Sequence, residues 1–436
     1  MKGDPPSVKK RNYYGLLATI SLSGFGDAFG LLAMEWLVYE LTGSKLAMGA
    51  LTLCSGIPEL VFRLLGSPLT DRLPRERLMA GLACVRFIAI VLPLIAGFTG
   101  QLQLWHLFLA AGLSGSCAAL FMPTAMALVP EIASSQKLVR AFAIIDGCRN
   151  AAALIGPAIA GAVTAASGAL PALGINAACY ATAIVTLLYL PKTKNQVQAP
   201  SPSSLSTYVR DIVESFSFYR QFPAMLGIMG MVSISNMCSI AIWTMMVPFV
   251  RENLHLNAAA LGTLTTASAL GTLTGLAIIS LLGEIKRRRT VMLCSLAAMG
   301  FFNAILGLVH SFPVALAVLF AAGAAGPFFG SLSSSLHGKL VPRHLQGRVN
   351  SIRFLIGGGL QPIGAFAGGI IAQLYGVPTL ILTAGLLPLL SSIAAALFLP
   401  NLKALNGDLS TLEAKLHGNG NLYTSMNSAD NITVDS

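Results

Sequence analysis

The chain has 436 residues, of which 55% are hydrophobic and only 10% charged, and its mean hydropathy is +0.73. Soluble domains carry about 25% charged residues, so this composition excludes a soluble globular protein and indicates a polytopic membrane protein. The net charge of +11 would suggest a nucleic-acid partner in a soluble protein. Here the basic residues follow the membrane topology instead, so no nucleic-acid partner is expected.

Twelve apolar runs follow one another, each long enough to cross a hydrocarbon layer of about 30 Å. They cover 13–41, 46–69, 78–98, 104–130, 139–166, 170–190, 223–250, 257–282, 290–310, 313–337, 348–375 and 378–399. Long unbroken runs favour helices over a β-barrel, so the expected fold class is an all-α membrane protein with two six-helix bundles.

The expected organisation follows from these runs and from the polar segments between them. It consists of a cytoplasmic N-terminus at 1–12, a six-helix bundle at 13–190, a cytoplasmic linker with an amphipathic helix at 191–222, a second bundle at 223–399 and a disordered cytoplasmic tail at 400–436.

Basic residues predict the orientation of the chain. Of the 28 Lys and Arg residues, 22 fall in segments on one side of a twelve-crossing chain, two on the other side and four within runs. Loops rich in Lys and Arg remain in the cytoplasm, so both termini are expected there.

The two halves also share residues at a constant spacing. Arg140, Gly161 and Gly168 recur as Arg348, Gly369 and Gly376, each 208 residues later. A parallel repeat of this kind is typical of transporters whose substrate site lies at the midplane between two halves.

Ionisable groups inside the runs are candidate functional residues, because each is costly to place in a membrane. The candidates for proton coupling or a substrate cavity, with two polar residues from the methionine-rich seventh run, are Asp27, Glu35, Glu59, Arg63, Asp146, Arg149, Asn236 and Trp243. A carboxylate in such a cavity can take up a proton near neutral pH and couple transport to a proton gradient.

For some of the acidic candidates, a purely structural role is the alternative to proton coupling. Glu59 with Arg63, and Asp146 with Arg149, lie one helical turn apart and could be structural ion pairs. Asp27 has no basic residue one turn away and is the main candidate for carrying a proton. Glu35 is expected nearer the outer surface, where hydration makes it less informative.

Two segments resemble motifs of major facilitator transporters. The loop at 67–77, with Asp71, Arg72 and Arg75, resembles the loop between the second and third helices of that superfamily. The resemblance implies a lock in which Asp71 contacts Arg348 or Arg353; a merely solvated loop is the alternative. The small residues of the fifth run resemble the antiporter motif of drug:proton exporters, although close helix packing would also explain them: Ala152, Gly156, Pro157 and Gly161.

The most specific resemblance is to the third drug:proton antiporter family, of the macrolide-efflux and enterobactin-exporter type. It rests on Gly26-Asp27, the segment 36–44, the segment 156–161 and Gly347-Arg348-Val349. One departure is that 108–116 is neutral, so the arginine-bearing fourth-helix motif of larger exporter families is absent.

This resemblance implies a monomeric protein of the bacterial inner membrane, surrounded by lipid, that exports a small amphiphilic molecule in exchange for protons. A siderophore transporter, for export or uptake, is the alternative within transport, and a non-transporting receptor or scaffold is the alternative from another class. An enzyme, a metal site or a cofactor is not expected, because the chain has no metal-ligand spacing and no phosphate-binding loop.

Overall fold

The computed structural model describes residues 6–66, 73–132, 138–189, 219, 223–341 and 346–406, and these residues contain no strand. Twelve of the described helices are long and apolar enough to cross a membrane, which confirms the twelve predicted runs. The predicted amphipathic helix of the linker and the tail beyond 406 lie outside the described residues, apart from Tyr219.

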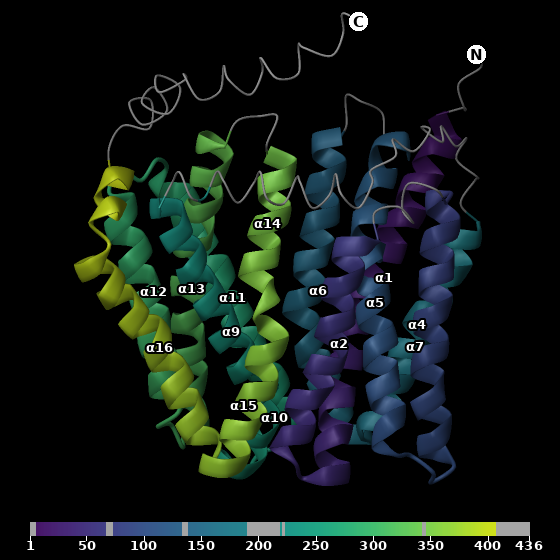
Figure 1. Ribbon diagram of the computed structural model, residues 1–436. Helices are drawn as coiled ribbons and strands as arrows, with labels where there is room; N and C mark the ends of the chain where they lie inside the picture. Colours follow the sequence, from purple (N-terminus) through teal and green to yellow (C-terminus); the bar gives the residue numbers. More distant parts are fainter. Residues whose placement is uncertain are drawn as a thin grey trace, which may run out of the picture.

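Six helices from the first half of the chain stand side by side in Figure 1, drawn in purple and blue. Each helix of this group packs against others of the group. They are α1 (Pro6–Thr42), α2 (Lys45–Leu65), α4 (Arg75–Phe98), α5 (Leu104–Ile132), α6 (Leu138–Ser167) and α7 (Ala169–Leu188).

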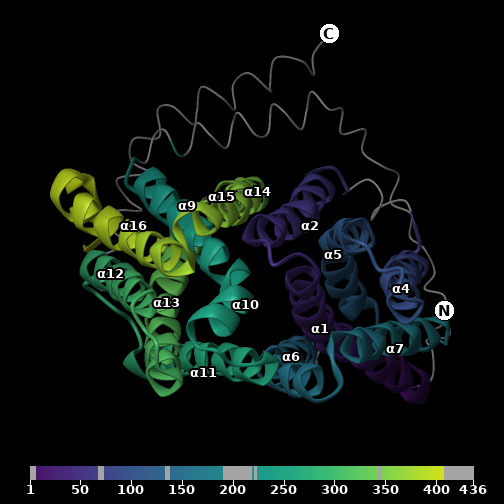
Figure 2. The same ribbon diagram turned by 90° about the horizontal axis from the view of Figure 1, so that it is seen from below.

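The helices of the second half form a second group, drawn in teal to yellow, and Figure 2 shows the two groups next to each other from below. This group contains α9 (Pro223–Thr244), α10 (Met246–Pro248), the π-helix η2 (Phe249–Asn253), α11 (Ala258–Leu282), α12 (Arg288–Leu306), α13 (Phe312–Leu340), α14 (Gln346–Gly359), α15 (Gln361–Tyr375), α16 (Val377–Phe398) and the 3₁₀ helix η3 (Pro400–Asn406).

Two predicted runs are broken in the structure rather than continuous. The run at 223–250 stops as an α-helix at Thr244, and the run at 348–375 is interrupted at Leu360. A proline lies just beyond each break, Pro248 in the first and Pro362 in the second. Proline has no N–H to donate and its ring clashes with the carbonyl four residues earlier, which accounts for both interruptions.

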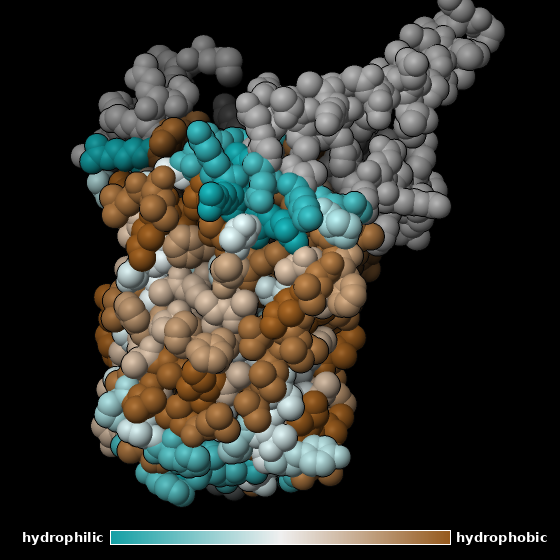
Figure 3. Space-filling model, turned by 90° about the vertical axis from the view of Figure 1, so that its left-hand side faces the viewer, coloured by the Kyte–Doolittle hydropathy of each residue, from teal (hydrophilic) through white to brown (hydrophobic). Residues whose placement is uncertain are grey.

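The outer surface matches a protein surrounded by lipid. Figure 3 shows a hydrophobic belt around the middle of the visible face, with hydrophilic residues above and below it. Large apolar side chains are also exposed along the middle of helices in both bundles, among them Ile88 of α4, Phe301 of α12 and Leu390 of α16. In water such surface would be unfavourable, whereas in a bilayer it is solvated by lipid chains.

The two bundles touch through α6 against α11 and through α2 against α15. A Cβ atom built on Gly161 of α6 would lie 3.0 Å from the Cα atom of Gly262, and one built on Gly49 of α2 would lie 3.3 Å from that of Gly369. Only glycine allows backbones to approach so closely. Gly161 and Gly369 are matched residues of the 208-residue repeat, so the repeat places equivalent glycines at both contacts.

The helices begin and end at two opposite ends of the molecule. The basic end carries the starts of α4 and α12, with Arg75 and Arg288. The opposite end carries the turns at Gly43, Gly168 and Gly376, each of which has a positive φ.

Candidate functional site

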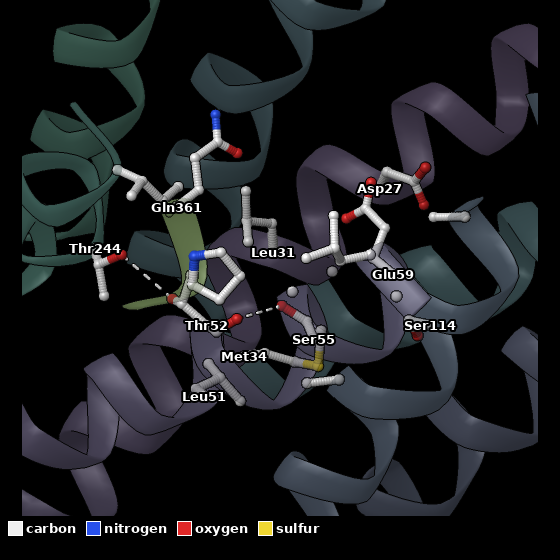
Figure 4. A pocket seen from close by; sticks show the side chains of 18 of the residues that line it. Asp27, Leu31, Met34, Leu51, Thr52, Ser55, Glu59, Ser114, Thr244 and Gln361 are labelled. Carbon is white, nitrogen blue, oxygen red and sulfur yellow. Dashed lines mark hydrogen bonds between the residues drawn. The ribbon is translucent and has the colours of Figure 1, made fainter. Parts of the chain in front are cut away.

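A cavity of about 590 Å³ lies between the two bundles. Its wall comes from α1, α2, α4, α5 and α7 of the first bundle and from α9, α14 and α15 of the second. Most of the wall is apolar, and five acidic or basic side chains lie in it: Asp27, Glu35, Glu59, Arg63 and Arg86. Figure 4 shows part of this wall, where the hydroxyl of Thr52 on α2 lies 3.3 Å from that of Thr244 on α9.

Asp27 has a partner, which corrects the expectation of an unpaired carboxylate. The Nη2 atom of Arg86 on α4 donates to Oδ1 of Asp27 at 2.5 Å, and the Tyr180 hydroxyl on α7 donates to the same oxygen. The Arg86 guanidinium also lies 4.6 Å from the centre of the Tyr180 ring, within the range of a cation–π contact. The partner comes from another helix, so spacing along α1 could not reveal it.

The two members of this ion pair differ in exposure. The Arg86 side chain is 7% exposed, whereas that of Asp27 is 43% exposed toward the cavity. A buried guanidinium without an opposite charge is strongly unfavourable. Removing Asp27 would therefore leave a buried charge, whereas removing Arg86 would leave a charge that water in the cavity can hydrate. The pair joins α1 to α4, and Tyr180 adds α7.

Glu35 lines the same cavity, two helical turns beyond Asp27 on α1. It makes no hydrogen bond or ion pair with any residue in the described part of the chain. Glu35 is among the residues predicted to line a cavity, and it does line the central one. Among the acids of this wall, the unpaired carboxyl group expected at Asp27 is found at Glu35.

The two predicted pairs within helices are present. Arg63 donates to Glu59, and both side chains line the cavity where α2 approaches the basic end. Arg149 and Asp146 lie 3.6 Å apart, with both side chains more than half exposed. This second pair does not line the central cavity, which corrects the expectation that it would.

The seventh run contributes less to the cavity than expected. Asn236 donates to the Gly357 carbonyl at 2.8 Å, joins α9 to α14 and does not line the cavity. Five methionines that give this segment its character are buried among the packed helices and do not line the cavity: Met225, Met229, Met231, Met245 and Met246. Trp243 does line the cavity, as predicted.

The predicted small-residue stripe of α6 faces two neighbouring helices. A Cβ atom on Gly156 would lie 2.8 Å from that of Ala28 on α1, and Ala152 lies opposite Gly24. One turn further, Pro157 and Gly161 approach Gly262 of α11. The stripe thus packs α6 against its own bundle and against the other one, and a role in antiport stays a prediction.

The predicted lock is described only in part. Asp71 and Arg72 lie outside the described residues, as does the side chain of Arg348. Arg75 pairs with Glu131 and donates to the Ala127 carbonyl, both in the first bundle, so its place in a lock between halves stays a prediction. Arg353 donates to the Ser334 hydroxyl at 2.6 Å, within the second bundle.

The second bundle repeats the Arg75–Glu131 pair with the charges exchanged. Glu284, which follows α11, lies 3.2 Å from Lys339, and Lys339 is 208 residues beyond Glu131. The hydrogen bond and positive charge of Lys339, with the charge of Arg288, lower the pKa of Glu284. Each of these pairs fastens helices within one bundle at the basic end.

At the opposite end, charged residues connect the bundles, a feature that sequence analysis missed. Glu252 of η2 accepts from the Tyr39 hydroxyl at 2.5 Å and lies 2.9 Å from Lys45. Arg251 donates to Glu40 at 2.7 Å, and its guanidinium lies 4.6 Å from the Trp36 ring centre. We call these six residues the outer cluster. It joins the two bundles at the end of the molecule away from Arg63, and none of its six residues lines the cavity.

Comparison with known proteins agrees with this architecture. The family model described as transmembrane secretion effector matches residues 10–419. The chain belongs to this family. It has the major facilitator fold: the crystal structure of the nucleoside transporter NupG superposes with a TM-score of 0.68 at 15% identity, covering 91% of this chain and 99% of that one.

Curated relatives of this family member are transporters. It is 22% identical to macrolide efflux protein A of Streptococcus pyogenes, over 87% of this chain and 93% of that protein. It is 24% identical to the multidrug efflux pump Tap of Mycolicibacterium fortuitum, over 88% and 94%. The staphyloferrin A transporter of Staphylococcus aureus matches at 25% identity over 45% of this chain and 49% of that protein. Like these proteins, the chain is a multi-pass membrane transporter and not an enzyme.

Because Arg86 is more buried than Asp27, we expect variants of the two residues to differ in stability. Asp27→Asn leaves the buried Arg86 charge without an acid. We expect this substitution to lower the free energy of unfolding by about 2–3 kcal/mol. Breaking a fully buried pair costs ~3–5 kcal/mol, and the smaller value reflects the partial exposure of Asp27. Arg86→Gln should cost less, since Asp27 can be hydrated in the cavity. Thermal unfolding in detergent measures both.

The double variant Asp27→Asn with Arg86→Gln completes this comparison and should be more stable than Asp27→Asn alone. A single Asp27→Asn variant as stable as the unmodified protein would contradict the assignment of Asp27 as the counter-charge of Arg86.

The outer cluster predicts a shift in conformation when Glu252 is neutralised. Glu252→Gln weakens the contacts to Tyr39 and Lys45. Two such contacts near the surface contribute about 1 kcal/mol. We therefore expect the ratio of molecules closed at this end to molecules open at this end to fall about fivefold. Spin labels at Leu41 and Leu256, one in each bundle, report the distance across this end. Glu131→Gln breaks a pair within one bundle and should leave that distance distribution unchanged; an equal effect of both variants would contradict the prediction.

Proposed function

We propose that this protein is a secondary active transporter that works by alternating access and exports small amphiphilic molecules in exchange for protons. The observation that supports this most is a mostly apolar cavity between two bundles in which one carboxyl group, that of Glu35, has no partner among the described residues. The outer cluster joins the bundles at one end of the molecule, while α2 carries the Glu59–Arg63 pair of the cavity wall toward the basic end.

The basic end is the cytoplasmic end in this proposal. Lys and Arg accumulate in the loops on that side, which corresponds to the positive-inside rule for a bacterial inner-membrane protein. The structure then corresponds to an inward-facing state, closed toward the outside. Labelling of a cysteine at Lys286 from the outside of intact cells would reverse this orientation.

The wall of the cavity supports an amphiphilic substrate. Leu31, Met34 and Ile90 supply apolar surface, and Trp243 supplies an aromatic face. The volume is in the range of pockets that hold drug-sized ligands, which are largely apolar with a few polar groups that fix orientation. The names of the macrolide and multidrug efflux relatives agree with export of such molecules.

Glu35 is the residue that carries the proton in this proposal. Asp27, Arg86, Glu59 and Arg63 neutralise one another in pairs. A proton on any of these acids would break an ion pair, whereas a proton on Glu35 breaks none. An unpaired carboxyl group in a poorly hydrated site can bind and release a proton as its access to water changes, which is the step that antiport requires.

This assignment predicts the effect of Glu35→Gln, which keeps the shape of the side chain but cannot release a proton. In proteoliposomes with an imposed pH gradient, we expect ethidium-dependent proton flux to fall to the rate of protein-free vesicles, while ethidium binding at equilibrium is retained. The matched control is Glu59→Gln, which removes a paired acid from the same cavity and should retain coupled flux. Full coupling in Glu35→Gln would refute the role of Glu35.

The alternatives predict other results in the same vesicles. A siderophore transporter, which the partial similarity to the staphyloferrin A transporter favours, would respond to a ferric siderophore and not to ethidium. A receptor or scaffold without transport would show no substrate-dependent flux with either compound.

A further inference from the structure

A second cavity, of about 700 Å³, opens in the second bundle. Its wall comes from α9, α11, α12 and α13 alone, and none of its lining residues is acidic or basic. The central cavity, by contrast, contains five acidic or basic side chains. Trp243 lines both cavities, so the neutral cavity adjoins the charged one at this indole.

The neutral cavity carries hydrogen-bonding groups that have no partner among the described residues. They come from each of its four helices and are Ser239, Ser268, Asn303 and Ser331. Serine and threonine within helices commonly donate to a carbonyl one turn earlier, as Thr272 and Ser334 do in this same wall. The four unpaired side chains are therefore free to bond with whatever occupies the cavity.

Glycines of α13 border this cavity. Gly326 and Gly330 line it together with Pro327, and a Cβ atom added to Gly330 would meet no atom within 4 Å, so this glycine faces open space. Gly323 has another role, because a Cβ atom there would clash with the backbone carbonyl of Ser268, so this glycine lets α11 approach α13. The cavity opens to the surface beside the exposed residues Gly330 and Ser334, so a ligand has access to it.

We infer that this neutral cavity is a second binding compartment, which takes an uncharged molecule, or the uncharged part of one, that carries hydroxyl or carbonyl groups on an apolar body. Its apolar wall suits such a body, and its serines and Asn303 can bond with the polar groups. An ion is disfavoured because no lining residue offers an opposite charge. The inference rests on the proposed function only in treating the cavity's occupant as substrate.

Equilibrium binding of two tritiated probes to the full chain in lipid nanodiscs tests the inference without transport. Hydrocortisone is neutral and bears hydroxyls on an apolar body, whereas tetraphenylphosphonium is a cation without hydrogen-bonding groups. Gly330→Phe places a phenyl ring in the neutral cavity, and we expect it to weaken hydrocortisone binding by at least tenfold and to leave tetraphenylphosphonium binding unchanged. Gly81→Phe, on the exposed face of α4 with no atom within 4 Å, is the matched control.

A second variant removes hydrogen bonding while keeping volume. Asn303→Leu should weaken hydrocortisone binding about three- to tenfold, as the loss of one hydrogen bond would. Absence of saturable hydrocortisone binding to the unmodified protein would overturn the inference, and so would full binding by Gly330→Phe. Because neither measurement requires flux, such a failure leaves proton-coupled export standing, and a failure of export leaves these binding results intact.

Discussion

The structure depends on the cost of placing a charge in an apolar medium without a partner. Four of the five acidic or basic side chains around the central cavity meet this constraint by pairing, and Arg86 is the extreme case because it is almost fully enclosed. Its partners Asp27 and Tyr180 come from two other helices, so one buried guanidinium contacts two further helices of the first bundle. Glu35 is left as the acid of this wall that no residue in the described chain pairs with, which is why we propose it as the proton carrier.

In the proposed mechanism the bundles move relative to one another, so the contacts between them matter. These contacts are glycine approaches of α6 on α11 and α2 on α15, the ion pairs of the outer cluster, and buried apolar side chains of α1, α2, α9 and η2 that share one core. The buried Asp27–Arg86 pair, by contrast, lies within the first bundle. Alternating access would break contacts across the interface and keep those within each bundle.

Hydropathy predicted the twelve spans, because the length of an apolar run reflects the thickness of the membrane directly. Spacing also revealed the pairs Glu59–Arg63 and Asp146–Arg149, whose members lie on one helix face. The same reasoning failed for Asp27, since its partner Arg86 is 59 residues away and only the packing of α1 on α4 brings them together. The sequence did not predict the breaks near Pro248 and Pro362, because a proline alone does not mark a break. Pro58, for example, lies inside the continuous helix α2.

The most direct test of the account is the protonation state of Glu35 itself. Infrared difference spectra of the full chain in lipid, recorded as tetraphenylphosphonium binds, report the loss of a protonated carboxyl band. The account predicts that the unmodified protein and Glu59→Gln lose this band on binding, and that Glu35→Gln shows no such change. A band that persists in Glu35→Gln and disappears in Asp27→Asn would contradict it, because the exchanged proton would then belong to the acid that pairs with Arg86.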